Sequence, residues 1–446
     1  MMPTMTFLKH ALLAAGGTLL LCSVAQAAIP IQHWVHGSGA RVYLVESPSI
    51  PMLDIQVNVD GGSRRDPAGQ AGLASATAGM LSAGIRAQAG QPALDENQLG
   101  EAWTDLGAQF GAGASAERFS LSLRTLTEPD LLRRAVALAA RQLAAPAWPE
   151  PVWQRERERM LAALQEEETQ PATHAARAFH AAVYGQHPFG VEVRPETLAA
   201  IRVADMEAFY RRHVVACRAQ VTLVGAIERE GANRIVDELM AAMGSHGCPE
   251  LAQVPEVQTL PAAVERRIPF DAAQAQVLIG QPGIRRDDPD FFPVFVGNYI
   301  LGGGGFVSRL TTQVREKRGL SYSVYSYFAP GLHAGAFQLG LTTRPDQADQ
   351  AVSVARDEVA RFVAQGPTED ELKAAKDFLI NGFALRLDSN RKLLDNVANI
   401  AWYGLPLDYL ETWKDRVRAV SVSDVKRAFG RVLQPERMVT VVVGGR

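Results

Sequence analysis

The amino-acid sequence predicts an α+β fold with two homologous halves, each a mainly antiparallel sheet with helices packed on one face. Three observations lead to this prediction. Within each half, strand patterns and helix patterns segregate instead of alternating strictly. A proline-rich stretch divides the chain near its middle, and a similar helix–strand unit ends both halves.

Composition agrees with a globular protein of more than one domain. The chain has 446 residues, of which 47% are hydrophobic and 21% charged. The formal net charge of −3 at pH 7 gives the chain no overall positive potential that would attract a polyanion. We therefore expect no binding to nucleic acid.

Residues 1–27 have the pattern of a cleaved secretory signal peptide. Lys9 precedes an apolar run from Ala11 to Leu21, and Ala25-Gln26-Ala27 suits signal peptidase. After cleavage, no apolar run is long enough to span a bilayer. We expect an exported protein without stable membrane insertion, which in a Gram-negative cell is periplasmic.

Residues 28–246 form the predicted N-terminal half. Apolar alternation and β-branched residues predict strands at 41–46, 53–59 and 119–124. Helical patterns follow at 128–144 and 150–168, the first of them stopped by Pro146. Residues 247–262 contain three prolines and no helical period, which predicts a linker.

Residues 263–446 form the predicted C-terminal half. Strands are expected at 275–280, 321–328 and 336–342, and helices near 290–301 and at 346–365 and 368–386. Thr368 and Glu371 have the spacing of a capping box. The order of strands and helices resembles that of the first half.

The ends of the two halves resemble each other in detail. Residues 196–225 and 415–444 align without a gap, and Asp205 coincides with Asp424, Gly225 with Gly444. Each segment predicts an amphipathic helix that opens near the shared aspartate, followed by a β-branched strand. Duplication explains the match better than chance.

Only Cys217 and Cys248 follow the predicted signal peptide. Two cysteines do not make a disulfide framework, so we favour two separate thiols, although an oxidising compartment would permit one bond.

The segment 61–83 contains the frame of a known metal-binding helix, without its ligands. Gly72-Leu73-Ala74 and Met80-Leu81 enclose Ser75, Ala78 and Gly79. This frame resembles G-L-A-H-x-x-E-H-M-L in the pitrilysin/insulinase family of zinc peptidases. In that family the two histidines bind zinc and the glutamate is the general base. Ser75, Ala78 and Gly79 replace them here.

The remaining ligand of the family motif is also replaced. After Glu158-Arg159, the position of the third ligand holds Gln165, with Glu166 beside it. None of the nine histidines stands next to a glutamate. A zinc site needs three protein ligands and one open position. We therefore expect no metal and no cofactor in this chain.

A second family signature lies in the C-terminal half. Residues 308–310 are S-R-L, and residues 315–322 resemble the family's R-E-K-x-G-L-x-Y. A helix over 308–317, with Leu310 and Val314 buried, would place Arg315 near Tyr322 across a turn at Gly319. In the following strand, Tyr322 is expected to share a face with Val324, Ser326 and Phe328.

The resemblance implies roles for Arg315 and Tyr322. The tyrosine hydroxyl would meet the developing oxyanion and the arginine a peptide carbonyl. The alternatives are a strand aromatic packed on a helix and a solvated cation at a helix end. Gly302, Gly303, Gly304 and Gly305 resemble a peptide-contacting glycine segment of the family's non-metal subunits. Their alternative is a tight turn between helices.

Three functions fit these features. The first, which we favour, is the non-metal subunit of a periplasmic zinc metallopeptidase. In that case a zinc-bearing partner of the same family completes a heterodimer, and Arg315 and Tyr322 act in trans on a peptide substrate. The second is a catalytically silent scaffold or peptide-binding protein. The third, an independent metallopeptidase, requires a zinc centre that the sequence lacks.

Overall fold

The computed structural model describes residues 29–88, 90–244 and 247–445. The predicted signal peptide lies outside these ranges. None of the helices within them is long and apolar enough to cross a membrane.

The first sheet belongs to the N-terminal half and has the order β1-β2-β8-β3-β7-β6. All neighbours are antiparallel except β2 and β8. The strands are β1 (Gln32–Val35), β2 (Arg41–Glu46), β3 (Met52–Val59), β6 (Gln109–Ala114), β7 (Phe119–Leu126) and β8 (Gln220–Gly225), with a separate small pair β4 (Gly84–Ile85) and β5 (Leu94–Asp95).

The second sheet belongs to the C-terminal half and has the order β11-β12-β10-β13-β9. Only β13 and β9 run parallel. Its strands are β9 (Val264–Ile268), β10 (Ala275–Pro282), β11 (Ser321–Phe328), β12 (Ala336–Thr343) and β13 (Val439–Val443). Both sheets are mainly antiparallel, which confirms the predicted fold class.

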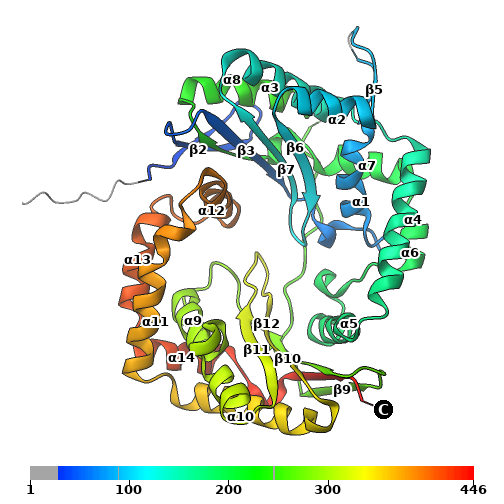
Figure 1. The fold of residues 1–446 in the computed structure, drawn as a ribbon. Helices are drawn as coiled ribbons and strands as arrows, with labels where there is room; N and C mark the ends of the chain where they lie inside the picture. Colours follow the sequence, from blue (N-terminus) through cyan, green and yellow to red (C-terminus); the bar gives the residue numbers. More distant parts are fainter. Residues whose placement is uncertain (1–28, 89, 245–246, 446) are drawn as a thin grey trace, which may run out of the picture.

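Helices complete each half (Figure 1). In the N-terminal half they are α1 (Leu73–Met80), α2 (Glu96–Asp105), α3 (Pro129–Ala144), α4 (Glu150–Glu167), α5 (Pro171–Tyr184), α6 (Pro195–Ala199), α7 (Val203–His213) and α8 (Arg229–Ala242). In the C-terminal half they are α9 (Phe291–Asn298), α10 (Ala348–Gln365), α11 (Glu369–Asn381), α12 (Asn390–Tyr403), α13 (Tyr409–Ala419) and α14 (Val422–Val432).

The predicted helix–strand units are present at both positions. Helices α7 and α14 have 11 residues each, and each is followed by a fully buried strand, β8 or β13. Asp205 and Asp424 occupy the same place in the first turn of their helices. The capping box of Thr368 and Glu371 also forms, at the start of α11.

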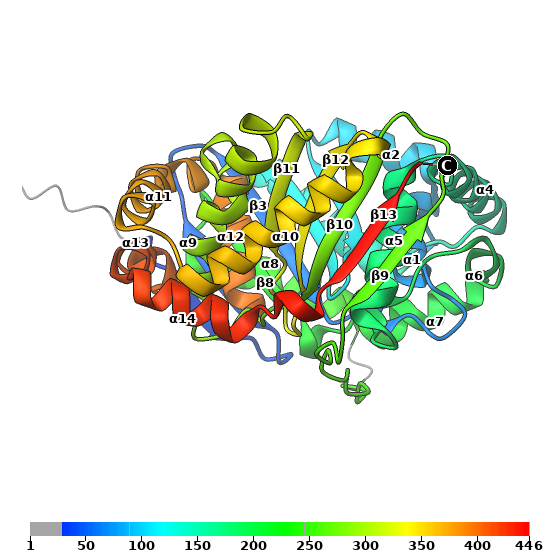
Figure 2. The ribbon, with the colours of Figure 1, turned by 90° about the horizontal axis from the view of Figure 1, so that it is seen from below.

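Each sheet receives one helix from the other half. In the C-terminal half, α10 and α5 lie on opposite faces of the sheet (Figure 2). Phe179 and Val183 of α5 are buried against β10 and β13. A Cβ atom at Gly280 would lie 2.9 Å from the Phe179 ring, so this glycine lets the helix approach closely. Reciprocally, α12 packs on β3 and β8 of the first sheet.

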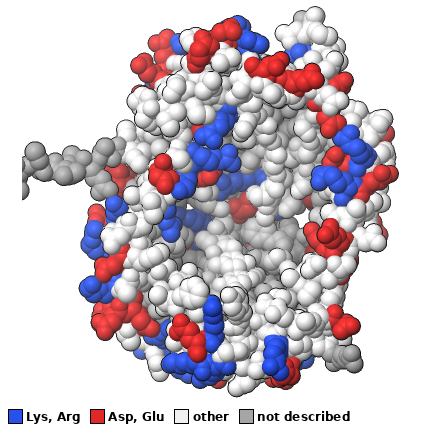
Figure 3. Space-filling model, in the orientation of Figure 1, with Lys and Arg blue, Asp and Glu red and all other residues white. Residues whose placement is uncertain are grey.

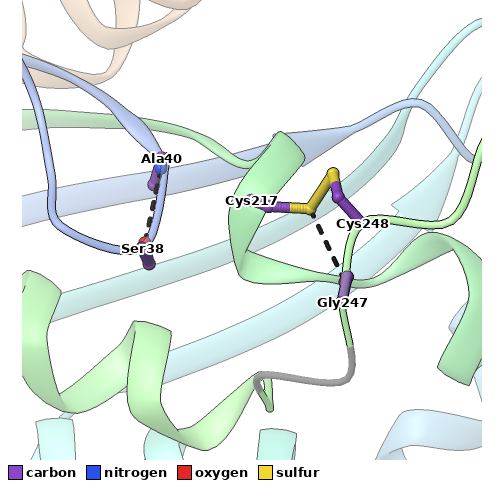
Figure 4. Close-up of a disulfide and its surroundings, with 5 residues drawn as sticks. All are labelled: Ser38, Ala40, Cys217, Gly247 and Cys248. Atoms are coloured by element: carbon purple, nitrogen blue, oxygen red, sulfur yellow. Dashed lines mark hydrogen bonds between the residues drawn. A yellow bond between two sulfur atoms is a disulfide. The ribbon is translucent and has the colours of Figure 1, made fainter.

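A disulfide joins Cys217 to Cys248, at the start of the proline-rich segment (Figure 4). The two cysteines are 31 residues apart in sequence, and their Cα atoms are 6.0 Å apart. The sequence-based preference for separate thiols was therefore wrong. The 3-10 turn Ala216–Arg218 that follows α7 brings Cys217 within bonding reach, which sequence spacing alone does not reveal.

Candidate functional site

The degenerate metal motif lies on α1. Ser75 and Gly79 are exposed and one helical turn apart, whereas Ala78 is buried in the core. Gln165 and Glu166 lie on α4, where both are exposed. Ser75, Ala78 and Gly79 thus present a hydroxyl, a methyl group and a hydrogen atom. The family motif has a histidine, a glutamate and a second histidine at these positions.

Asp66 fixes the start of α1. Its carboxylate accepts hydrogen bonds from the backbone N–H groups of Gly72, at 2.8 Å, and Ala74, at 2.9 Å. Burial raises the pKa of Asp66 to about 6, and the hydrogen bonds from the helix start oppose that rise. The helix frame is therefore maintained although its metal ligands are gone.

The residues present do not fit zinc. Among the residues that the structure describes, no three histidine, cysteine, aspartate or glutamate side chains are grouped to hold a metal ion. Ser75 and Gly79 supply neither imidazole nor carboxylate, the side chains that bind zinc through nitrogen or oxygen.

The glycine segment adjoins β11. A π-helical turn, Tyr299–Gly303, continues α9, and such turns are frequent at functional sites. Gly302 is buried, and a Cβ atom there would lie 2.4 Å from Ser326 Oγ of β11. Gly303 and Gly305 are exposed, and Gly304 is half-buried. Gly305 has a φ of 61°, a conformation that favours glycine.

Arg315 lies in a second π-helical segment, Thr311–Glu316, within the predicted helix. Leu310 and Val314 are buried, as predicted. Gly319 adopts a φ of 60°, and its N–H donates to the Arg315 carbonyl, which ends the helix where the sequence predicted. The chain then enters β11.

Tyr322 occupies a β-bulge at the start of β11. Ser321 and Ser323 pair with the consecutive residues Thr343 and Thr342, so Tyr322 is the extra residue. Val324 and Ser326 are buried, but Tyr322 is 81% exposed. The prediction that these side chains share one face was wrong, because the bulge turns Tyr322 outward.

Arg315 and Tyr322 lie together, as the sequence predicted. The Arg315 guanidinium carbon is 4.6 Å from the centroid of the Tyr322 ring and 4.7 Å from that of Phe306. Within the described residues, the side chain of Arg315 has no ion pair and donates no hydrogen bond. The positive charge of Arg315 is therefore stabilised by cation–π contacts with the rings of Tyr322 and Phe306. Its N–H donors remain available to a ligand.

Phe306 is the member of this group that the sequence did not identify. It follows Gly305 and is 69% exposed. An exposed phenylalanine directly after a glycine run was the available signal.

Comparison with known families identifies one model that matches. It describes the peptidase M16 inactive domain and matches residues 200–379. These residues include β8, the proline-rich segment, the glycine segment, Arg315 and Tyr322.

A crystal structure of a peptidase M16 inactive domain from Pseudomonas fluorescens is similar over almost the whole fold. Its TM-score is 0.87 at 32% identity, over 93% of this chain and 98% of that one. A non-peptidase homologue, YmxG, from Helicobacter pylori is 24% identical over 90% of both chains. An uncharacterised zinc protease of Streptomyces coelicolor is 30% identical, over 56% of this chain and 55% of that protein.

Proposed function

Because the chain belongs to the peptidase M16 inactive-domain family, we propose that it is the non-metal subunit of a two-chain zinc metallopeptidase. The observation that carries this proposal is Arg315, whose guanidinium is placed between Phe306 and Tyr322 without an acidic partner in the described structure.

In the proposed complex, Arg315 and Tyr322 act on a peptide bound between the two chains. Arg315 donates hydrogen bonds to a peptide carbonyl, and the Tyr322 hydroxyl donates to the oxygen on which negative charge develops. The charge on the guanidinium strengthens such bonds. The partner's zinc would supply the activated water.

The fold supports an extended peptide at this site. Strand β11, which carries Tyr322, is an edge strand of its sheet. Edge strands present unpaired backbone groups to which an extended peptide can add. We include Gly302, Gly303, Gly304 and Gly305 in the proposed substrate site because Gly302 packs directly on β11.

We also propose that the chain is exported to the periplasm and consists of two homologous units, 28–246 and 263–446, joined by 247–262. The Cys217–Cys248 disulfide supports an oxidising compartment. The matched pairs α7–β8 and α14–β13 support the two units.

Reconstitution tests the proposed function. The purified chain is mixed with a zinc-bearing family member from the same cell, identified by an H-x-x-E-H helix, and hydrolysis of fluorogenic peptides is followed. We expect neither chain alone to hydrolyse peptides at the rate of the mixture. We also expect both chains to elute together in size-exclusion chromatography.

Two outcomes contradict this assignment. Zinc-dependent hydrolysis by this chain alone would make it an independent peptidase. Full activity of a complex that contains the double variant Arg315→Ala/Tyr322→Phe would favour the silent scaffold.

A further inference from the structure

The seam between the two halves contains arginines that form no ion pair with an acidic side chain of the described residues. The seam is the surface where Arg41 and Arg218 of the first half meet Leu332 and Trp402 of the second, around a cavity of about 430 Å³. In the space-filling view, Lys and Arg side chains gather around the hollow in the middle of the molecule (Figure 3).

Arg218 is incompletely neutralised in this cavity. Its Nη1 atom is buried and has no hydrogen-bond partner among the described residues. Burial lowers the pKa of Arg218, although Asp60 opposes that effect. Arg41 is exposed and takes part in no ion pair with a described residue. Arg41 can therefore donate hydrogen bonds to an anionic ligand, and Arg218 adds positive charge to the wall of the same cavity.

Two more arginines lie near Tyr403. The Arg118 guanidinium carbon is 5.0 Å from the ring centroids of both Trp402 and Tyr403. Arg286 lies over Phe291, at 3.7 Å, and donates to the Tyr409 hydroxyl at 2.6 Å. Burial raises the pKa of Tyr403, and Arg118 and Arg286 both oppose that rise, so both charges are close to its hydroxyl.

The neighbouring carboxylates of Glu117 and Asp60 already accept hydrogen bonds from other groups. Glu117 is buried and accepts hydrogen bonds from Leu332 N–H, at 2.7 Å, and Trp402 Nε1, at 3.2 Å. Asp60 accepts from Arg64 and Arg65. In the described part of the chain, Arg41, Arg118, Arg218 and Arg286 thus form no ion pair with a carboxylate, although Asp60 also lines the seam cavity.

We propose that the seam binds an acidic segment of the peptide substrate, with aspartate or glutamate carboxylates on these four arginines. Guanidinium groups bind carboxylates in a bidentate manner. The half-buried ring of Tyr403 lies beside Arg118. This inference rests on the proposed function, because it names the substrate class of the same complex.

Binding to the chain alone tests the inference without the partner. Fluorescence anisotropy is measured with a labelled glutamate-rich peptide, its glutamine isostere and a lysine analogue. We expect the glutamate peptide to bind at least about tenfold more tightly than the glutamine isostere, and its affinity to fall as salt is added.

Variants locate the binding surface. Arg41→Gln/Arg218→Gln and Arg118→Gln/Arg286→Gln should each weaken glutamate-peptide binding about tenfold. The control is Arg211→Gln, at an exposed arginine of α7 that lines neither the seam cavity nor the Arg315 site. It should bind like the native chain.

Circular dichroism of each variant checks that it folds. Removal of Arg218 is not expected to destabilise the fold, because its Nη1 atom makes no hydrogen bond to a described residue.

Equal binding of the glutamate and glutamine peptides, or no binding of either, overturns the inference. Unchanged binding by both double variants would overturn it as well. None of these results bears on whether the chain activates a zinc-bearing partner, so the two proposals can fail separately.

Discussion

Phe306 and Tyr322 hold Arg315 by their ring faces, so the position of the guanidinium depends on an aromatic side chain at residue 306. We expect Phe306→Ala to lower kcat of the reconstituted complex about twofold to fivefold, the value of an exposed cation–π contact. Phe306→Tyr should restore the rate, because it restores the ring. Val307→Ala is the matched control, since Val307 is the exposed neighbour.

A pH effect is expected from Asp66. Its pKa in the folded state, about 6, lies above the ordinary value of 3.8, so the folded state disfavours the charged form. The contribution of Asp66 to the free energy of unfolding should therefore be greatest below pH 3.8 and fall as pH rises to about 6. A shift of this size corresponds to about 3 kcal/mol at most.

Urea unfolding at several pH values measures this contribution. The difference in free energy of unfolding between the native chain and Asp66→Asn should change between pH 3.8 and about 6. A difference that is constant over this range would show that Asp66 does not titrate there.

The sequence predicted Arg315 and Tyr322 at the candidate site but not how Tyr322 is oriented. Their proximity follows from a local helix end at Gly319, which short-range rules describe. The bulge at Tyr322 depends on the register between β11 and β12, and that register is set by packing between distant segments. Phe306 was not predicted because nothing local ties its ring to Arg315.

Among the elements, the π-helical turn Tyr299–Gly303 packs closely against β11 because Gly302 has no side chain. A Cβ atom there would lie 2.4 Å from Ser326 Oγ and 2.6 Å from Ser326 N. Gly302→Ala should therefore destabilise the protein by about 1–3 kcal/mol, as overpacking does.

Gly79→Ala is the control for this substitution. Gly79 is an exposed helical residue with open space around its Cβ position, so alanine should stabilise α1 by about 0.5–1 kcal/mol. Urea denaturation measures both changes. Native stability of Gly302→Ala would show that the turn can move away from β11.

Most helices and strands could be predicted from hydrophobic periodicity and capping residues, as α7, α11 and α14 illustrate. Periodicity could not predict that α5 packs on the sheet of the C-terminal half and α12 on the sheet of the N-terminal half. Each is an amphipathic helix, and its pattern shows that one face is buried without showing which sheet covers it.

For the whole molecule, the Cys217–Cys248 disulfide fastens the start of the proline-rich segment to the N-terminal half. It closes a loop with a sequence separation of 31 residues. Loop-closure entropy for that length predicts a loss of about 3–4 kcal/mol in stability when the bond is absent.

Unfolding of the native chain with and without reductant tests this value. We expect the reductant to lower the unfolding temperature of the native chain but not that of Cys217→Ser/Cys248→Ser. Equal unfolding of the native chain under both conditions would argue against a stabilising disulfide.

In the proposed function, Tyr322 takes part in a reaction centred on the zinc of a partner chain. The most direct test is kcat of the reconstituted complex with Tyr322→Phe, beside Tyr325→Phe on the same strand. We predict a loss of about 10²-fold for Tyr322→Phe, typical of a lost oxyanion donor, and a native rate for Tyr325→Phe. A native rate for Tyr322→Phe would contradict the claim.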